Sequence, residues 1–276
     1  MTMTTNPNQM LDGNSRRLEL APEDATPPAN IPTDATLPSG GALRNGRLSL
    51  DALPANLTIA IDGPARTGKN TAGELVAEAI GGVLVDSGRF YRALTQAAVV
   101  AGINLDVPAA IAQFCRQVRL EAHLDYDGGQ VREAVVSVNG VCFGKQELNA
   151  IGADAPKLGK LAPVRDMVNL ALRRLCGTGR VIVLGRDMGA RVFPDADMKI
   201  FFTAPTDVLE QRQLQTTGLP GVTQRLAADQ NNTFCAAEAL KIDTAQHPPA
   251  AVCDLILVEI SRRFMGGGTS RSTVAE

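Results

Sequence analysis

Aromatic residues and long apolar runs are scarce in this chain. It contains no Trp, and aromatic residues make up 4% of its 276 positions. Few rings are therefore available to stack single-stranded bases or to line a sugar-binding cleft. No apolar run approaches the length of about 18 residues that a membrane-spanning helix needs, and no apolar signal segment follows the first residues. We therefore predict a cytoplasmic protein with no membrane partner.

An excess of charge of one sign is also missing. Lys and Arg number 27, Asp and Glu number 29, and the formal net charge is −2. Such a balance creates no field that would gather nucleic acid, so we expect no nucleic-acid partner.

The residue patterns of metal binding and thiol chemistry are absent from the sequence. The closest two of the five cysteines, Cys235 and Cys253, lie eighteen positions apart, and the two histidines are His123 and His247. This spacing of cysteines and histidines does not fit a zinc site, a C-x-x-C thiol-exchange pair or a His-based catalytic triad. We predict reduced thiols and no metal ion held by protein ligands.

Composition divides the chain into three parts. Residues 1–55 contain no aromatic side chain and seven of the sixteen prolines, which predicts a disordered extension. Three consecutive glycines begin a polar segment at 266–276, which we interpret as a flexible tail. The remaining residues, 56–265, are predicted to form one folded domain.

Short apolar runs alternate with helical patterns in this domain. Predicted strands cover 57–62, 83–85, 181–184 and 199–203, and predicted helices cover 71–80, 90–101 and 250–264. This alternation predicts an α/β fold with a doubly wound parallel sheet of about five strands. Residues 121–143 differ, because apolar runs flank Asn139-Gly140, a strong hairpin signal that predicts an antiparallel insert.

A glycine-rich segment connects the first predicted strand to the first predicted helix. Its residues are Gly63, Pro64, Ala65, Arg66, Thr67, Gly68, Lys69, Asn70 and Thr71. The pattern G-x-x-x-x-G-K in this context is typical of a phosphate-binding loop, with backbone N–H groups and a lysine facing the phosphates. An ordinary glycine turn is the alternative. The strict motif has Ser or Thr directly after the lysine, whereas here the hydroxyl comes one position later, on Thr71.

Four segments of the chain resemble bacterial cytidylate kinases. The glycine loop is similar to that of the family, which also has Thr two positions after the lysine. Residues 85–93, 161–165 and 185–202 resemble further family segments, in the same order and at compatible spacing. The resemblance implies a P-loop nucleoside monophosphate kinase fold. It also implies a small antiparallel insert that binds the monophosphate, at about 119–160, and a short lid at about 209–237.

The resemblance further implies ATP-dependent phosphoryl transfer to CMP or dCMP, with ATP and Mg²⁺ as cofactors, and we expect a monomer. The glycine loop would bind the donor. The implied catalytic residues are Lys69, Arg186 and Asp187, and the implied acceptor-binding residues are Asp86, Ser87, Arg92, Arg165, Arg186 and Asp187. Arginine suits this role because its planar group bonds phosphate bidentately and stays charged. Asp86 either lies on the magnesium side or caps the following helix.

The predicted lid departs from the family. Residues 227–237 contain no arginine where the family has several. A different small acceptor, or a nucleotide-binding protein with weakened catalysis, therefore remains an alternative function. Arg66 stands where the family has glycine. Its side chain either points at the phosphates in place of a lid arginine or projects into solvent.

Overall fold

The computed structural model describes a defined part of the chain. The described ranges are residues 50–127, 130–177, 179–217 and 233–265, together with the paired backbone segments β1 (Leu43–Arg44) and β2 (Arg47–Leu48). The predicted tail, most of the predicted extension and part of the predicted lid lie outside these ranges.

Five parallel strands form the central sheet in the order β10-β9-β3-β8-β4. They are β3 (Leu57–Asp62), β4 (Val83–Asp86), β8 (Arg180–Gly185), β9 (Met198–Thr203) and β10 (Leu240–Asp243). Ile59, Ala60 and Ile61 of β3 are completely buried, because both faces of the sheet are covered. The predicted parallel sheet is confirmed, and its four predicted strands agree with the structure to within one residue at each end.

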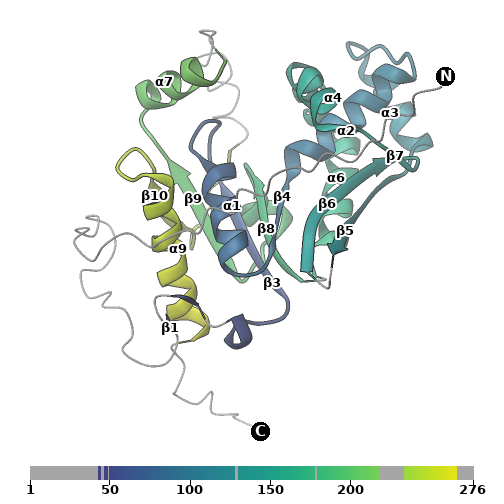
Figure 1. The fold of residues 1–276 in the computed structure, drawn as a ribbon. Coiled ribbons are helices and arrows are strands. Elements are labelled where there is room, and N and C mark those ends of the chain that lie inside the picture. Colours follow the sequence, from purple (N-terminus) through teal and green to yellow (C-terminus); the bar gives the residue numbers. More distant parts are fainter. Residues whose placement is uncertain are drawn as a thin grey trace, which may run out of the picture.

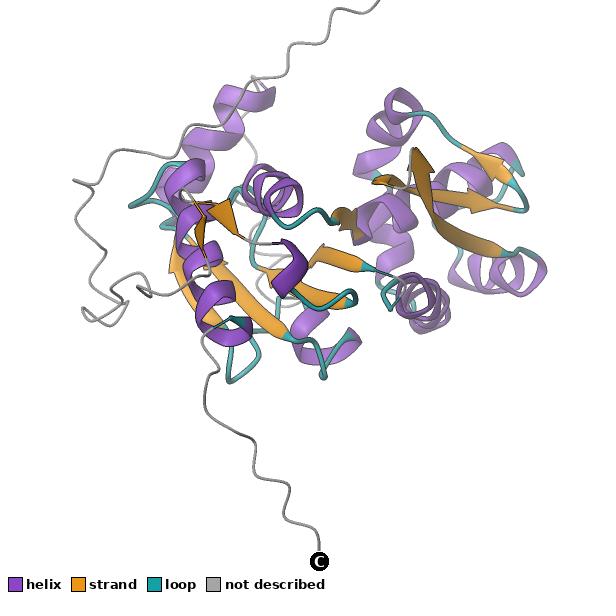
Figure 2. Ribbon diagram, turned by 60° about the horizontal axis from the view of Figure 1, so that its bottom comes forward, coloured by secondary structure: helices purple, strands orange, loops and turns teal. Residues whose placement is uncertain are grey.

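Helices cover both faces of this sheet, as the doubly wound prediction requires (Figures 1 and 2). On one face, α1 (Lys69–Ala79) and α9 (Pro249–Phe264) bury Val76 and Ile256 against the strands. On the other face, α2 (Ser87–Val100) and α6 (Ala162–Leu175) bury Leu94 and Leu172. The apolar core therefore has two layers with the sheet between them.

The antiparallel insert is also present. It follows α3 (Pro108–Gln117) and contains β5 (Leu120–Asp127), β6 (Gln130–Val138) and β7 (Val141–Cys142). Asn139 and Gly140 have φ angles of 51° and 77°, as expected for the predicted hairpin turn. Then α4 (Lys145–Ala150), η2 (Ile151–Ala153) and α5 (Ala155–Gly159) return the chain to α6. In Figure 1 the insert lies beside α2 and α6.

Two helices begin earlier than the sequence predicts. α2 begins at Ser87 rather than at residue 90, because the Asp86 side chain caps it and accepts a hydrogen bond of 2.8 Å from the Gly88 N–H. α1 begins at Lys69, directly after the left-handed Gly68, rather than at residue 71. Helix α2 therefore begins directly after β4, and helix α1 begins directly after the glycine loop.

The folded region begins before the predicted boundary at residue 55. Leu53, next to the short helix η1 (Leu50–Ala52), is 5% exposed and packs into the core. The Arg180 guanidinium donates hydrogen bonds to the carbonyl oxygens of Leu50, Leu53 and Pro54 at 2.7, 3.1 and 2.9 Å. Residues 50–54 are thus attached to the sheet by one arginine, which composition alone does not predict.

Two further elements complete the described fold. The π-helical turn η3 (Met188–Val192) follows β8, and α7 (Thr206–Thr217) follows β9. Among the described helices, none combines the length and apolar character needed to cross a bilayer.

Candidate active site

The carboxyl ends of three neighbouring parallel strands bring the predicted site residues together. β3 leads into the glycine loop, β4 leads into Asp86 and Ser87, and β8 leads into Arg186 and Asp187. Strand β8 pairs with both other strands, so these three segments share one edge of the sheet. In open α/β sheets this edge is the usual ligand-binding edge.

The glycine loop has the backbone of a phosphate cradle. Gly63 has φ 147°, and a Cβ atom there would lie 2.5 Å from the carbonyl oxygen of Phe202, so only glycine fits. Thr67 is fully buried and its hydroxyl donates a 2.9 Å hydrogen bond to the Pro64 carbonyl. No side chain caps the amino end of α1, so its first-turn amides are suited to bind an anion.

Lys69 lies over this loop from the first residue of α1. Its Nζ donates hydrogen bonds of 2.7 Å to the carbonyl oxygens of both Gly63 and Pro64. The ammonium group is thus held at the concave side of the loop, where phosphate oxygens could accept the same donors.

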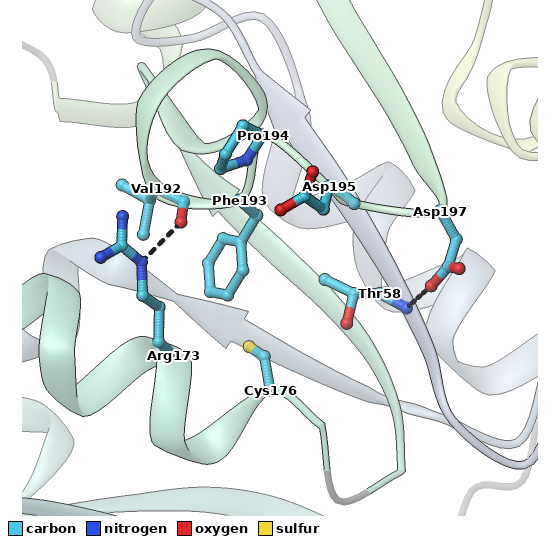
Figure 3. Close-up of a pocket in the computed structure, with 9 residues that line it drawn as sticks. Thr58, Arg173, Cys176, Val192, Phe193, Pro194, Asp195 and Asp197 are labelled. Atoms are coloured by element: carbon cyan, nitrogen blue, oxygen red, sulfur yellow. Dashed lines mark hydrogen bonds between the residues drawn. The ribbon is translucent and has the colours of Figure 1, made fainter.

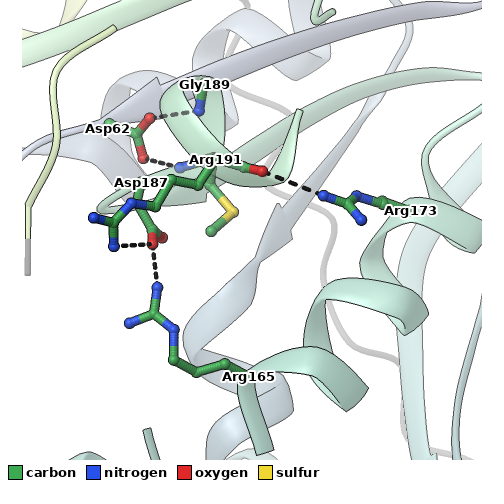
Figure 4. A network of polar contacts seen from close by, with 7 residues as sticks. Asp62, Arg165, Arg173, Asp187, Gly189 and Arg191 are labelled. Atoms are coloured by element: carbon green, nitrogen blue, oxygen red, sulfur yellow. Dashed lines mark hydrogen bonds and ion pairs between the residues drawn. The ribbon is translucent and has the colours of Figure 1, made fainter. Parts of the chain in front are cut away.

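Asp62 ends β3 just before the loop, and the sequence analysis assigned it no role. Its carboxylate is almost fully buried and accepts hydrogen bonds of 2.8 Å from the Met188 N–H and 2.7 Å from the Gly189 N–H (Figure 4). Burial, opposed by these two hydrogen bonds, raises the pKa of Asp62 to about 6. Asp62 therefore fixes the η3 turn to the strand that carries the loop. A lone acid at the end of a buried strand is the signal that could have identified it.

Two arginines meet the buried Asp187 carboxylate (Figure 4). Arg165 on α6 forms a hydrogen-bonded ion pair with it, and Arg191 Nη1 lies 3.9 Å from the same oxygen. The Arg191 guanidinium also lies 3.4 Å from the ring centre of Phe234. The structure therefore brings together Arg165 and Asp187, as predicted, and adds a contact of Arg191 with the same carboxylate.

A second ion pair lies at the amino end of α2. Arg92 Nη2 is 2.8 Å from Asp86 Oδ2, and Asp86 also caps the helix, as one of the two alternatives for this carboxylate predicts. Arg92 Nε is buried and has no partner among the described residues. Ser87 is buried beside this pair, and Gly152 of the insert lies against the Arg92 side chain. The insert thus reaches the side of the site formed by α2.

The remaining predicted residues are also at this edge. Asn70 and Thr71 lie exposed in the first turn of α1. Arg186 is partly buried, and its carbonyl oxygen accepts a 2.6 Å hydrogen bond from the Phe234 N–H. Residues 218–232 of the predicted lid are outside the described residues.

A cavity of about 320 Å³ lies at the opposite edge of the sheet (Figure 3). Thr58, near the start of β3, lines it, and so do Arg173, Cys176 and Asp197. The Thr58 N–H donates a 2.8 Å hydrogen bond to the Asp197 carboxylate, and Arg173 Nε donates a 2.8 Å hydrogen bond to the Val192 carbonyl oxygen. Because Lys69 follows the other end of β3, this cavity is separate from the glycine loop.

The comparison with known families agrees with this geometry. The family model described as cytidylate kinase matches residues 59–262. The chain belongs to the cytidylate kinase family. The match covers the glycine loop, the insert and all five strands of the central sheet except the first two residues of β3.

Curated relatives support membership of the family. A cytidylate kinase of Herpetosiphon aurantiacus is 33% identical over 213 residues, which cover 72% of this chain and 92% of the relative. A cytidylate kinase of Rhodococcus opacus is 31% identical over 215 residues, covering 75% and 89%. The resemblance drawn from the sequence is therefore confirmed, and the protein is a nucleotide kinase of this family.

Proposed function

We propose that this protein transfers the γ-phosphoryl group of ATP to CMP or dCMP. One observation carries the proposal: the glycine loop with Lys69 shares a sheet edge with two arginine–carboxylate pairs, Arg92–Asp86 and Arg165–Asp187. Phosphoryl transfer requires two anions to be held against each other with cations around them. This edge supplies a donor cradle and an acceptor side with arginines.

The donor side is assigned to residues 63–71. The loop amides and Lys69 would hold the ATP phosphates, because α1 has no capping side chain to compete for its amino end. Thr71, exposed in the first turn of α1, offers a hydroxyl oxygen of the type that Mg²⁺ accepts, which fits an ion that enters with ATP. When bound, Mg²⁺ would neutralise part of the phosphate charge.

The acceptor side is assigned to Arg92, Arg165 and Arg186, with Ser87 and Asp187 as polar contacts. Arg92 supports this because its buried Nε has no partner among the described residues, while Asp86 holds the same guanidinium. Asp187 holds Arg165 in the same way. Carboxylates that fix arginines in place lower the entropy lost when a phosphate binds.

The insert and the lid complete the proposal. Residues 119–160 would enclose the acceptor, since Gly152 lies against Arg92. Residues 209–237 would form the lid, which begins within α7.

A turnover assay tests the proposed function. We would measure release of ADP from magnesium-ATP with CMP, dCMP, UMP, AMP or no acceptor, for the natural protein and Lys69→Ala. Lys241→Ala is the matched control, because Lys241 is exposed on β10. We expect turnover with CMP or dCMP that is lost in Lys69→Ala and kept in the control. Turnover with another acceptor, or none with any, would overturn the assignment.

A further inference from the structure

Arg66 occupies a backbone conformation that favours glycine. Its φ angle is 65°, and among the described residues the other non-glycine residue with positive φ is Asn139, in the hairpin turn. Asparagine tolerates this conformation because its short amide can hydrogen-bond to the nearby backbone, whereas arginine gains no such local bond and is strained there. An arginine at the centre of the glycine loop is therefore held against its local preference.

The Arg66 side chain is bound by α7 and does not project freely into solvent. Its Nε donates a hydrogen bond to the side-chain carbonyl oxygen of Gln213, and the residue is partly buried. The preceding helix residue, Arg212, donates a 3.3 Å hydrogen bond to the Arg66 backbone carbonyl. The solvent alternative raised from the sequence is therefore wrong.

Arg212 is itself fixed, which makes the attachment rigid. Its guanidinium donates hydrogen bonds of 3.1 Å to the Thr244 hydroxyl and 2.7 Å to the Thr244 carbonyl oxygen. Thr244 follows directly after β10. Helix α7 thus holds both the backbone and the side chain of Arg66. The side chain is anchored at Nε, on the edge of a planar group that bonds phosphate well.

Phosphoryl transfer requires positive charge close to the moving phosphoryl group. In the transition state, charge spreads over the oxygens of the moving phosphoryl group, and arginine is the residue that commonly stabilises it. Residues 227–237 of the chain contain no arginine. Arg66 adds a second cation within the glycine loop, three positions before Lys69.

We propose that Arg66 is a catalytic residue that contacts the transferred γ-phosphoryl group, and that Gln213 is its positioning residue. The inference rests on the proposed function. In the step, an oxygen of the acceptor's phosphate dianion forms a new bond to the γ-phosphorus as the bond from that phosphorus to the β–γ bridging oxygen breaks. That bond's electron pair leaves with ADP, and no net proton is exchanged. Arg66 stabilises the moving group without exchanging a proton.

Nucleotide binding tests the contact without turnover. Calorimetric titration of Arg66→Gly with magnesium-ATP and magnesium-ADP, in the absence of acceptor, separates the γ-phosphate from the rest of the nucleotide. We expect affinity for ATP to fall about tenfold or more and affinity for ADP to change less than about twofold. Equal losses for both nucleotides, or no loss for ATP, would overturn the proposal. Glycine relieves the backbone strain, so a folding defect is not expected, and a melting temperature at or above that of the natural protein verifies this.

Steady-state kinetics then tests the catalytic role. We expect Arg66→Gly to lower kcat about a hundredfold or more with little change in KM for the acceptor. The kcat of Arg66→Lys should lie between those of the natural protein and Arg66→Gly. Gln213→Ala should lower kcat less than Arg66→Gly does. Gln113→Ala, exposed on α3 away from the site, should leave kcat unchanged. A kcat unchanged in Arg66→Gly would refute the role. If the natural protein itself fails to turn over CMP, the proposed function fails, while the ATP-to-ADP binding ratio still decides the Arg66 contact.

Discussion

Replacement of Asp62 by asparagine gives a sharp test of how the site is built. The Asp62 carboxylate is buried beneath the glycine loop and accepts hydrogen bonds from the backbone N–H groups of Met188 and Gly189 at 2.8 and 2.7 Å. Asparagine has nearly the same shape as protonated aspartic acid but cannot become negative. The substitution therefore removes the charge and one of the two acceptor oxygens while leaving the packing in place.

The pKa of Asp62 sets the expected size of the effect. Burial raises this pKa from 3.8 to about 6, so the folded state prefers the protonated group. The stabilisation from that preference is complete below about pH 4 and is lost as the pH rises through about 6. The difference between these two pKa values corresponds to about 3 kcal/mol as an upper limit. Asp62→Asn leaves one buried backbone N–H without an acceptor, which costs about 1–3 kcal/mol at every pH. Relative to the natural protein, its stability should increase by up to about 3 kcal/mol between pH 4 and pH 7.5.

Urea denaturation followed by circular dichroism at several pH values between 4 and 7.5 measures this difference. Asp125→Asn, at an exposed position on β5, is the control for removing a negative charge. We also expect kcat/KM to fall in Asp62→Asn, because one backbone amide of η3 loses its acceptor. The phosphate group of the CMP acceptor also loses a proton near pH 6, but this changes the kcat/KM of both proteins alike. A stability difference that does not change between pH 4 and 7.5, or that changes in favour of the natural protein as the pH rises, would refute the reasoning.

Three further substitutions test other contacts. Gly63→Ala places a methyl group 2.5 Å from the Phe202 carbonyl oxygen, so we expect a loss of about 2–4 kcal/mol in a thermal unfolding measurement; an unchanged melting temperature would contradict it. Arg165→Met removes one acceptor-side arginine and leaves the buried Asp187 with the longer contact to Arg191, so the KM for CMP should rise while the KM for ATP stays constant in initial-rate kinetics. Arg180→Met removes four hydrogen bonds to backbone carbonyls far from the loop, which should lower the free energy of unfolding by about 2 kcal/mol in urea and leave kcat unaffected.

Local patterns were enough to predict the framework of this protein. Short apolar runs marked the strands because a strand covered on both faces must be apolar throughout. Asn139-Gly140 predicted the hairpin because both residues adopt positive φ. The glycine loop could be recognised because its backbone geometry depends on glycine at fixed positions, as the close approach of Gly63 to Phe202 demonstrates.

The tertiary structure alone decided how the charged side chains are paired. Arg165 meets Asp187 across 22 positions of sequence, and Arg66 meets Gln213 across 147. No periodicity of the sequence encodes such contacts, because they depend on which strand ends become neighbours in the sheet. The same reason explains why Asp62 was missed and why the contact of Arg66 with α7 was not predicted. The sequence therefore determined which elements form and which charged residues each one carries, whereas the order of the strands determined which of those residues meet.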